Sequence, residues 1–234
     1  MCIVTYIPSD CGFSLTSNRD ERFDRPTIAP RIYGAENAPL IYPLDLKGKG
    51  TWFSINPKEK KVCCLLNAEK QYPQGRQKQS RGHIPIAWIS VSKFDFHKTP
   101  LDLYASFELI TVENINRSII IKKHNWNERK FKSEVLNPKK PYLWCSSSLY
   151  SKENEDEFQN LFKEKIPRLK KTQRIIEFHK KIAQPLNSDR YKEKNKNIQT
   201  VSITHLKVKK SGAKMKYVDL SADKPNIDGL SIHQ

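Results

Sequence analysis

Long hydrophobic runs are missing from this 234-residue sequence, and glycine is scarce, with 8 residues. A transmembrane helix needs about 20 consecutive apolar residues, whereas the longest candidate here extends only from Ile84 to Val91. The amino terminus also lacks the charged segment and the apolar stretch of a secretory signal peptide. We therefore expect a cytoplasmic protein that does not span a membrane.

Cysteine is sparse and lacks the spacing of a metal site. The five residues are Cys2, Cys11, Cys63, Cys64 and Cys145, without a CxxC pair or a histidine at zinc spacing. An odd number in this pattern argues against a disulfide framework and a zinc site. We expect Cys63 and Cys64 to be small buried core residues. We expect no metal or organic cofactor.

Acidic residues are outnumbered, 25 against 42 basic ones, which gives a net charge of +17. The excess lies in the second half, because residues 1–120 carry +4 and residues 121–234 carry +13. Such asymmetry can indicate nucleic acid or an anionic membrane surface as a partner. Lys and Arg nevertheless occur in short scattered groups without a recognition motif, which favours a solvated basic surface. We do not expect nucleic acid as a partner, and peripheral contact with an anionic membrane remains an alternative.

Strand and helix signals alternate in blocks along the chain. The predicted strands cover residues 2–7, 12–18, 51–55, 61–66, 107–112, 118–122, 141–145, 200–208 and 214–220, and the predicted helices cover 84–94, a segment from 99, 151–166 and 174–183. Residues 22–50 are rich in Pro, Gly and polar groups and predict a long ordered loop. This order favours an α+β fold with one domain over residues 1–220, followed by a polar tail over 221–234.

The second residue carries the most informative chemistry. Removal of Met1 would leave Cys2 with a thiol and a free α-amine on one residue. An α-amine with a pKa of about 7.7–8.0 can act as a base at neutral pH, and a thiol with a pKa of about 8.5 is already partly ionised. This combination is typical of amino-terminal nucleophile catalysis.

A charged cluster follows the first predicted hairpin, at Asn18 to Glu21. If the first two strands pair antiparallel, the end of the second strand lies beside Cys2. Arg19 could then hold the thiolate, and Asp20 could bind the α-amine. The alternative is a salt-bridged turn that only fixes the hairpin.

Several motifs together resemble one family. They are Met1-Cys2-Ile3-Val4, Thr16-Ser17-Asn18-Arg19-Asp20-Glu21, Arg25-Pro26, Gly50-Thr51-Trp52-Phe53-Ser54-Ile55, Leu65-Leu66-Asn67 and Ser80-Arg81-Gly82. In this order they resemble the NRDE family, also called the transport and Golgi organization protein 2 family. The similarity covers roughly residues 1–220.

This resemblance implies a four-layer αββα sandwich of two antiparallel sheets between helical layers, similar to amino-terminal nucleophile hydrolases. It implies that Cys2 is the nucleophile of a hydrolase that acts on a small amide, ester or thioester. Arg19 and Asp20 would be its charged neighbours, and Asn67 would help to form an oxyanion hole. An amide donor in that position can lower the barrier by about 2.7–4 kcal/mol. Asn67 has the alternative of capping the turn that follows it.

Four further residues are candidates for binding substrate or supporting the site: Asn18, Glu21, Arg81 and Ser147. Which of Asn18 and Arg19, and which of Asp20 and Glu21, faces the nucleophile is left open, because the hydrolases space their Arg and Asp differently.

Two departures from the family pattern weaken the case for hydrolysis of a bile-salt-like amide. Ser146 to Ser148 stand where the family often has Ser-Asn, and residues 197–200 lack a late Arg. The family also suggests a different function, a non-catalytic carrier or trafficking protein for haem or lipid that uses the same pocket. The oligomeric state is left open.

The histidines offer no recognisable catalytic or metal-binding pair. They are His83, His97, His124, His179, His205 and His233. We expect each to be a surface residue or a satisfied core residue.

Overall fold

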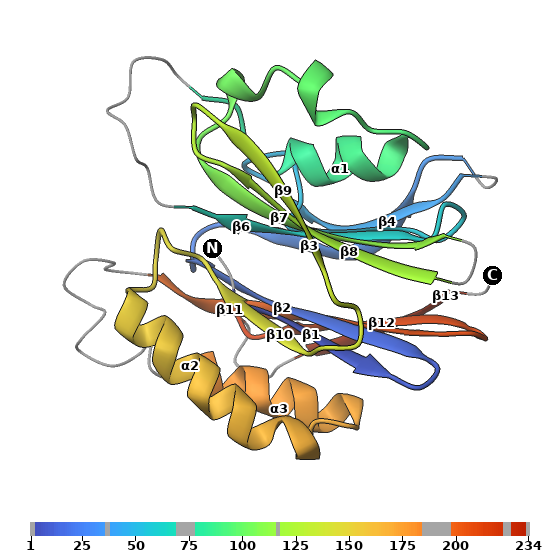
Figure 1. Cartoon of the computed structure of the whole chain (residues 1–234), viewed down its shortest axis with the longest axis vertical. Helices are drawn as coiled ribbons and strands as arrows, with labels where there is room; N and C mark the ends of the chain where they lie inside the picture. Colours follow the sequence, from blue (N-terminus) through green and yellow to red (C-terminus); the bar gives the residue numbers. More distant parts are fainter. Residues whose placement is uncertain are drawn as a thin grey trace. The chain divides into compact units, whose positions relative to one another are not determined.

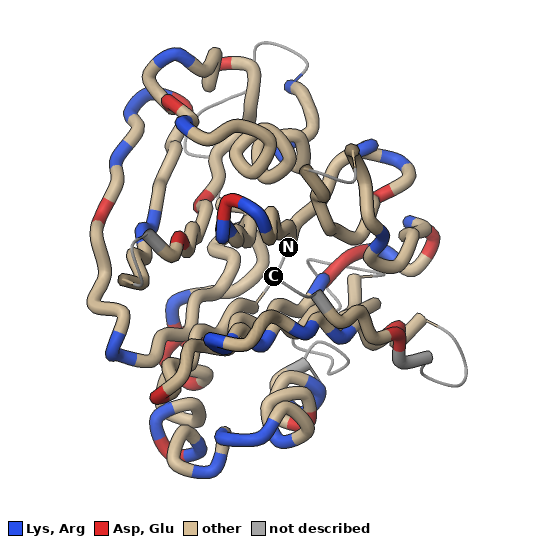
Figure 2. Tube along the Cα trace, turned by 90° about the vertical axis from the view of Figure 1, so that its right-hand side faces the viewer, with Lys and Arg blue, Asp and Glu red and all other residues tan. Residues whose placement is uncertain are grey.

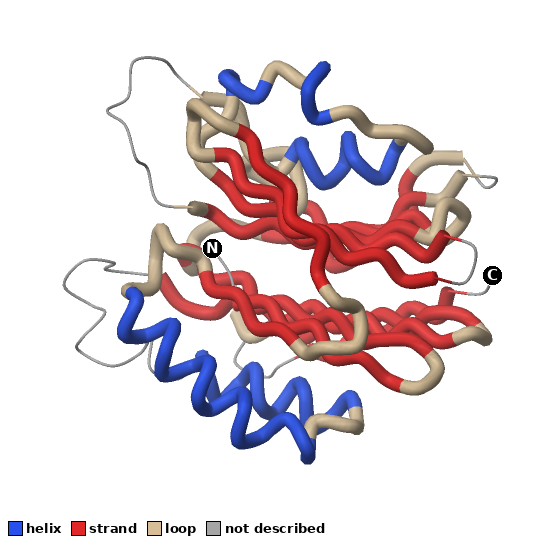
Figure 3. The backbone as a smooth tube through the Cα atoms, in the orientation of Figure 1, coloured by secondary structure: helices blue, strands red, loops and turns tan. Residues whose placement is uncertain are grey.

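The computed structural model describes residues 3–35, 38–68, 78–115, 118–183, 198–221 and 226–232. The chain divides into two compact units, Met1–Arg25 with Lys139–Gln234, and Pro26–Pro138. Each unit contains one antiparallel sheet and at least one helix (Figure 1 and Figure 3). The predicted α+β class with two antiparallel sheets is therefore confirmed. A single domain over residues 1–220 stays a prediction.

The first unit is built on a six-stranded sheet in the order β10-β1-β2-β11-β12-β13. Its strands are β1 (Ile3–Ser9), β2 (Gly12–Arg22), β10 (Tyr142–Cys145), β11 (Ile198–Lys209), β12 (Gly212–Asp219) and β13 (Asn226–Ile232). Helices α2 (Lys152–Lys165) and α3 (Thr172–Ala183), joined through the 3₁₀ turn η3 (Ile166–Arg168), lie along one face of this sheet (Figure 1). An apolar cluster that includes Ile3, Phe158 and Phe178 packs between these helices and the sheet.

Helix α2 begins at a complete capping box. Ser151 Oγ accepts from the Asn154 main-chain N–H at 3.4 Å, and Asn154 Oδ1 accepts from the Ser151 main-chain N–H at 3.2 Å. The amphipathic pattern over residues 151–166 predicts this helix, although Asn stands where the usual box has Glu or Gln. The amide oxygen of Asn154 performs the same acceptor role.

The second unit is built on a seven-stranded sheet in the order β3-β4-β5-β6-β7-β8-β9. Its strands are β3 (Thr27–Tyr33), β4 (Leu40–Asp45), β5 (Phe53–Asn56), β6 (Lys61–Asn67), β7 (Phe107–Ile115), β8 (Ser118–Trp126) and β9 (Phe131–Leu136). Helix α1 (His83–Ser90) and the 3₁₀ turns η1 (Phe96–Lys98) and η2 (Leu101–Leu103) cover one face of it (Figure 1). Ile84, Trp88 and Ile89 of α1 pack there against an apolar cluster of the sheet.

The predicted loop over residues 22–50 is wrong, because β3 and β4 occupy much of it. Pro30 argues against a strand in the sequence, but β3 is an edge strand whose pairing with β4 is irregular between Ile28 and Arg31. Proline is tolerated at edges and bulges because no ladder donor is needed there. Helix α1 also ends at Ser90 rather than at residue 94, and the predicted helix near residue 99 is only the short turn η2.

Two further edge strands, β9 and β13, were not predicted, and the reason is the same for both. Most residues of β9 are exposed, and β13 follows Leu220, where the sequence predicts the last regular strand to end. Edge strands gain their order from backbone hydrogen bonds to one neighbour, so their side chains need no apolar pattern. β13 pairs in this way with β12 over Asn226 to Ile232.

Candidate functional site

Strand β2 brings the charged cluster into a defined register. Arg19 lies opposite Ser202 of β11, and Asp20 lies opposite Thr200, with an irregularity of β11 between those two positions. Asn18, Arg19 and Asp20 are all buried. Successive side chains of a strand point to opposite faces, so Arg19 and Asp20 face opposite sides of the six-stranded sheet.

Asp20 is a fully buried carboxylate held by two hydroxyl groups. Thr200 Oγ1 donates to its Oδ1 at 2.5 Å, and the Tyr150 hydroxyl donates to its Oδ2 at 2.7 Å. Burial raises the pKa of Asp20, and the hydrogen bonds from Thr200 and Tyr150 oppose that rise. Neither partner could be recognised from sequence, because they lie 180 and 130 residues away from Asp20 along the chain.

Arg19 is the buried cation of the cluster, with 3% of its surface exposed. Its Nη1 donates to the main-chain oxygen of Arg25 at 3.4 Å, so the turn after β2 folds back over the guanidinium. The arrangement therefore buries a guanidinium group close to the end of strand β2.

Asn18 is bound to helix α3. Its Nδ2 donates to the main-chain oxygen of His179 at 3.1 Å, which leaves Oδ1 to accept from His179 Nδ1 at 2.6 Å. With Nδ1 protonated, Nε2 accepts from the Thr5 hydroxyl at 2.7 Å. Burial lowers the pKa of His179 to about 3. Asn18 thus points toward the helix side of the sheet, as Asp20 does.

Glu21 ends the buried part of the strand and pairs with Arg25 at 3.1 Å. Arg22 and Asp24 form a second, exposed ion pair at 2.6 Å. Ion pairs therefore hold the turn at residues 21–25, whereas Asn18, Arg19 and Asp20 lie within strand β2. The alternative that the cluster only fixes the hairpin stays a prediction.

Asn67 and Arg81 belong to the second unit. Asn67 is the last residue of β6, is half-buried and lies opposite Phe107 of β7. Its role beside Cys2 stays a prediction, as does the alternative of a turn cap, because residues 69–77 lie outside the described part of the chain.

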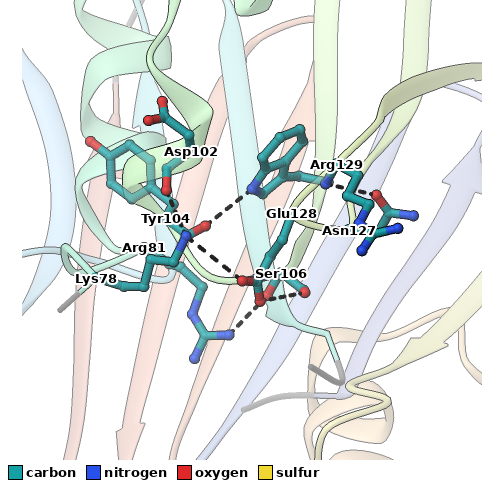
Figure 4. A network of polar contacts seen from close by, with 9 residues as sticks. Lys78, Arg81, Asp102, Tyr104, Ser106, Asn127, Glu128 and Arg129 are labelled. Atoms are coloured by element: carbon teal, nitrogen blue, oxygen red, sulfur yellow. Dashed lines mark hydrogen bonds and ion pairs between the residues drawn. The ribbon is translucent and has the colours of Figure 1, made fainter. Parts of the chain in front are cut away.

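Arg81 belongs to a polar network around Ser106 (Figure 4). Its Nη1 donates to the Ser106 main-chain oxygen at 2.9 Å. The N–H and hydroxyl of Ser106 donate to Glu128 Oε1 at 3.2 and 3.0 Å, and Lys78 lies 3.7 Å from Glu128 Oε2. Glu128 has a φ of 72°, which is uncommon outside glycine. These contacts tie the SRG segment to strand β7 and to the β8–β9 turn.

The glycines of two family motifs touch each other. The Thr51 main-chain N–H donates to the Gly82 carbonyl at 2.9 Å. A Cβ on Gly50 would lie 2.5 Å from the carbonyl carbon of Gly82, closer than any real contact. The two motifs, Gly50–Trp52 and Ser80–Gly82, therefore need glycine so that their backbones can approach each other. This is a packing role.

Ser147 is exposed in the turn after β10, between Ser146 and Ser148, whose hydroxyls lie 3.0 Å apart. Cys2 lies outside the described residues. The predicted burial of Cys63 and Cys64 is confirmed, and burial raises the pKa of Cys63 to about 12. Cys145 is also buried, whereas Cys11 is exposed.

Three histidines are satisfied core residues, as predicted. Both ring nitrogens of His124, His179 and His205 lie within hydrogen-bond distance of hydroxyl or amide oxygens. In the described part of the chain, no three His, Cys, Asp or Glu side chains gather in a way that could hold a metal ion. His233 lies outside that part.

Along the Cα trace, positions of Lys and Arg occur on strands, helices and loops, and positions of Asp and Glu are interspersed among them (Figure 2). This distribution agrees with the scattered basic groups seen in the sequence. None of the helices in the described ranges has both the length and the apolar character of a membrane-spanning segment.

Two comparisons with known proteins bear on the family. The uncharacterized protein YGR127W of Saccharomyces cerevisiae is 36% identical over 118 residues, which cover 46% of this chain and 36% of that protein. The chain thus spans little more than a third of that relative's length. A family model described as Transport and Golgi organisation 2 matches residues 1–219. The resemblance carried by the motifs is therefore confirmed, and the chain belongs to the Transport and Golgi organisation 2 family.

Proposed function

We propose that the protein is a cysteine-type amino-terminal nucleophile hydrolase of a small amide, ester or thioester, acting through Cys2 after removal of Met1. The observation that supports this most is the register of β1 with β2, in which Val4 lies opposite Ser17. If this register continues by two residues, position 2 lies opposite Arg19. Side chains of directly opposed residues share a face of the sheet, so the thiol would lie on the same side as the guanidinium.

The two charged neighbours would then have separate roles. A nearby cation lowers the pKa of a thiol and increases its thiolate fraction, which is the role we assign to Arg19. Asp20 faces the other side, and each of its carboxylate oxygens accepts one hydroxyl hydrogen bond. A carboxylate oxygen can accept more than one hydrogen bond, so Asp20 can also bind the α-amine of residue 2 at the strand end.

The proposed reaction has two steps. The Cys2 sulfur attacks the carbonyl carbon while the α-amine takes the thiol proton. The bond to the leaving amine, alcohol or thiol then breaks, and the α-amine returns the proton to that group. Water attacks the resulting thioester, with the α-amine again accepting a proton, and releases the carboxylic acid and the free thiol.

Asn67 would donate a hydrogen bond to the oxyanion formed in both steps. This role and the αββα sandwich are both implied by the family resemblance, and we propose both as part of the function. Asn67→Ala should then lower kcat by roughly 100-fold or more, with KM changed much less.

Intact mass spectrometry of the full chain treated with p-nitrophenyl acetate tests the proposal. We expect loss of Met1, addition of one acetyl group and loss of that group on standing. Cys2→Ala should abolish acetylation, and Cys11→Ala should retain it. Cys11 is a matched control because it is an exposed thiol of the same hairpin.

Three outcomes would contradict the enzyme. They are a retained Met1, labelling that follows Cys11 instead of Cys2, and unchanged hydrolysis by Cys2→Ala. An acetyl group that stays on Cys2 would favour the alternative carrier for haem or lipid, which predicts ligand binding without turnover.

A further inference from the structure

The first unit contains a cavity of about 420 Å³ at the far end of β1 from residue 3. Its lining includes Ile7 of β1, Ser14 of β2 and Lys207 of β11. It also includes Ile166 of η3 and Lys170 in the turn before α3. The volume is typical of a small-molecule site, since such pockets measure about 300–1,000 Å³.

The register places this cavity on the helix side of the sheet. Lys207 lies two residues after His205, whose Nε2 is 3.1 Å from the Thr172 hydroxyl at the start of α3. Residues two apart in a strand share a face, so Lys207 faces the helices. Ser14 is its direct partner on β2. The cavity therefore lies between the sheet and the connection from α2 to α3.

The floor of the cavity is apolar. Leu169 is buried in the cluster beneath α2 and α3, and Ile7 and Ile166 pack against that cluster. Burying an alkyl group against these side chains is favourable because it removes apolar surface from water. The floor therefore fits the hydrocarbon part of a ligand.

The rim carries more positive than negative charge. Lys170 and Lys207 line it together with Asp10, the acidic side chain of the lining. Neither lysine forms an ion pair within the described residues. The positive charge of Lys207 also contributes, after burial, to the lowered pKa of His205.

From this combination we propose that the cavity binds a small amphiphilic anion. An alkyl body would lie on Ile7, Ile166 and Leu169, and a carboxylate or phosphate head group would bind Lys170 and Lys207. An apolar floor alone would accept a neutral or cationic alkyl compound equally well. The two lysines favour the anion, and their field outweighs that of the single Asp10.

This site is separate from the proposed nucleophile. Ile7 lies four positions after Ile3 in β1, a distance of about 13 Å along an extended strand. Binding in the cavity should therefore survive Cys2→Ala. The two proposals can fail independently.

Isothermal titration calorimetry of the full chain with four eight-carbon or shorter probes tests the site. Octanoate and octyl phosphate should bind saturably, and the tighter of the two identifies the preferred head group. Octylamine and acetate should each bind at least roughly tenfold more weakly, because one lacks the anion and the other lacks the apolar body.

Variants locate the binding. Lys207→Met and Lys170→Met should each weaken octanoate binding by roughly five- to tenfold, whereas Lys209→Met, an exposed lysine of the same strand that does not line the cavity, should not. Thermal unfolding of each variant checks that it is folded. Equal binding of octylamine or of acetate, binding that the cavity variants leave unchanged, or no saturable binding of either anion would overturn the proposal.

Discussion

The two sheets bury different side chains beneath their helices. Helix α1 meets its sheet through Ile84, Trp88 and Ile89 in an apolar cluster. Helix α3 also contributes apolar residues, but its His179 lies in a buried hydrogen-bonded group with Asn18 and Thr5. Buried hydrogen bonds also join α1 to its sheet, where Asn56 Nδ2 donates to the Ile89 main-chain oxygen at 2.8 Å. In the unit that carries the charged cluster, however, a side chain of the helix, the imidazole of His179, makes such contacts with the strands.

This difference has a physical consequence. Apolar contacts are not directional and tolerate small shifts, whereas a buried polar group that loses its partner costs about 1–3 kcal/mol. The hydrogen bonds of Asn18 and Asp20 therefore fix the position of β2 more strictly than packing alone. Because Arg19 lies between these two residues, its position is fixed with them.

Among the variants proposed, removal of the imidazole of His179 should lower the free energy of unfolding most. His179→Leu introduces an apolar side chain and leaves Asn18 Oδ1 and the Thr5 hydroxyl without their imidazole partner, so we expect the free energy of unfolding to fall by about 4 kcal/mol. Urea denaturation measures this loss. His97→Leu, at an exposed histidine, is the control and should change stability by less than about 0.5 kcal/mol. Equal small effects would show that the polar group is dispensable.

The unit of helix α1 should be most sensitive to backbone crowding. Gly50→Ala places a Cβ 2.5 Å from the Gly82 carbonyl carbon, and relief of this clash requires movement of the main chain. We expect a loss of about 3 kcal/mol, near the upper end for overpacking. Gly229→Ala is the control, because its Cβ would meet nothing closer than 4.0 Å. Similar melting temperatures for both variants would contradict the close-approach role.

Lowering the pH should destabilise the first unit through His179 and His205, and the second unit through His124. Burial lowers the pKa of His179 and of His205 to about 3, and that of His124 to about 4. Depressed folded pKa values mean that each histidine's contribution is fully present above about pH 6.5 and is lost as the pH falls through the window down to those values. Each should reduce the unfolding free energy by about 1.4 kcal/mol per pH unit between pH 6 and pH 4.5.

Asp20 acts with the opposite sign. Its raised pKa means that its contribution is complete below its unfolded pKa and is lost as the pH rises through the folded value. Urea denaturation at several pH values should show that the free energy of unfolding falls less steeply with decreasing pH in His179→Leu than in the parent chain. A parent stability that is constant from pH 6.5 to 4.5 would contradict the buried neutral histidines.

Helix capping should have the smallest effect. Helix α2 has the Ser151–Asn154 box, whereas Gly82 at the start of α1 makes no side-chain cap bond. Ser151→Ala should lower the unfolding free energy by about 1 kcal/mol, as measured by thermal unfolding. Lys152→Ala, which removes only exposed ion pairs, should cost less than about 0.5 kcal/mol. A larger loss from Lys152→Ala than from Ser151→Ala would contradict the capping role.

Much of the fold could be predicted because it follows from local patterns. The hairpin of β5 and β6 appears in the sequence as two apolar runs around Asn56 and Pro57, and α2 and α3 appear as amphipathic periods. The edge strands β3, β9 and β13 could not be predicted, because pairing with one neighbour supplies their order. A proline or a polar run in the sequence hides such a strand.

The candidate site divides in the same way. The sequence by itself determined the family, the α+β class and the charged cluster at Asn18 to Glu21, because motifs and hydrophobic periods are local and need no partner. Only the tertiary structure decided that Asp20 is held by Tyr150 and Thr200, that Asn18 is bound to His179, and that Gly50 meets Gly82. Those partners are distant along the chain, and the sheet register and helix packing that bring them together are properties of the folded chain as a whole.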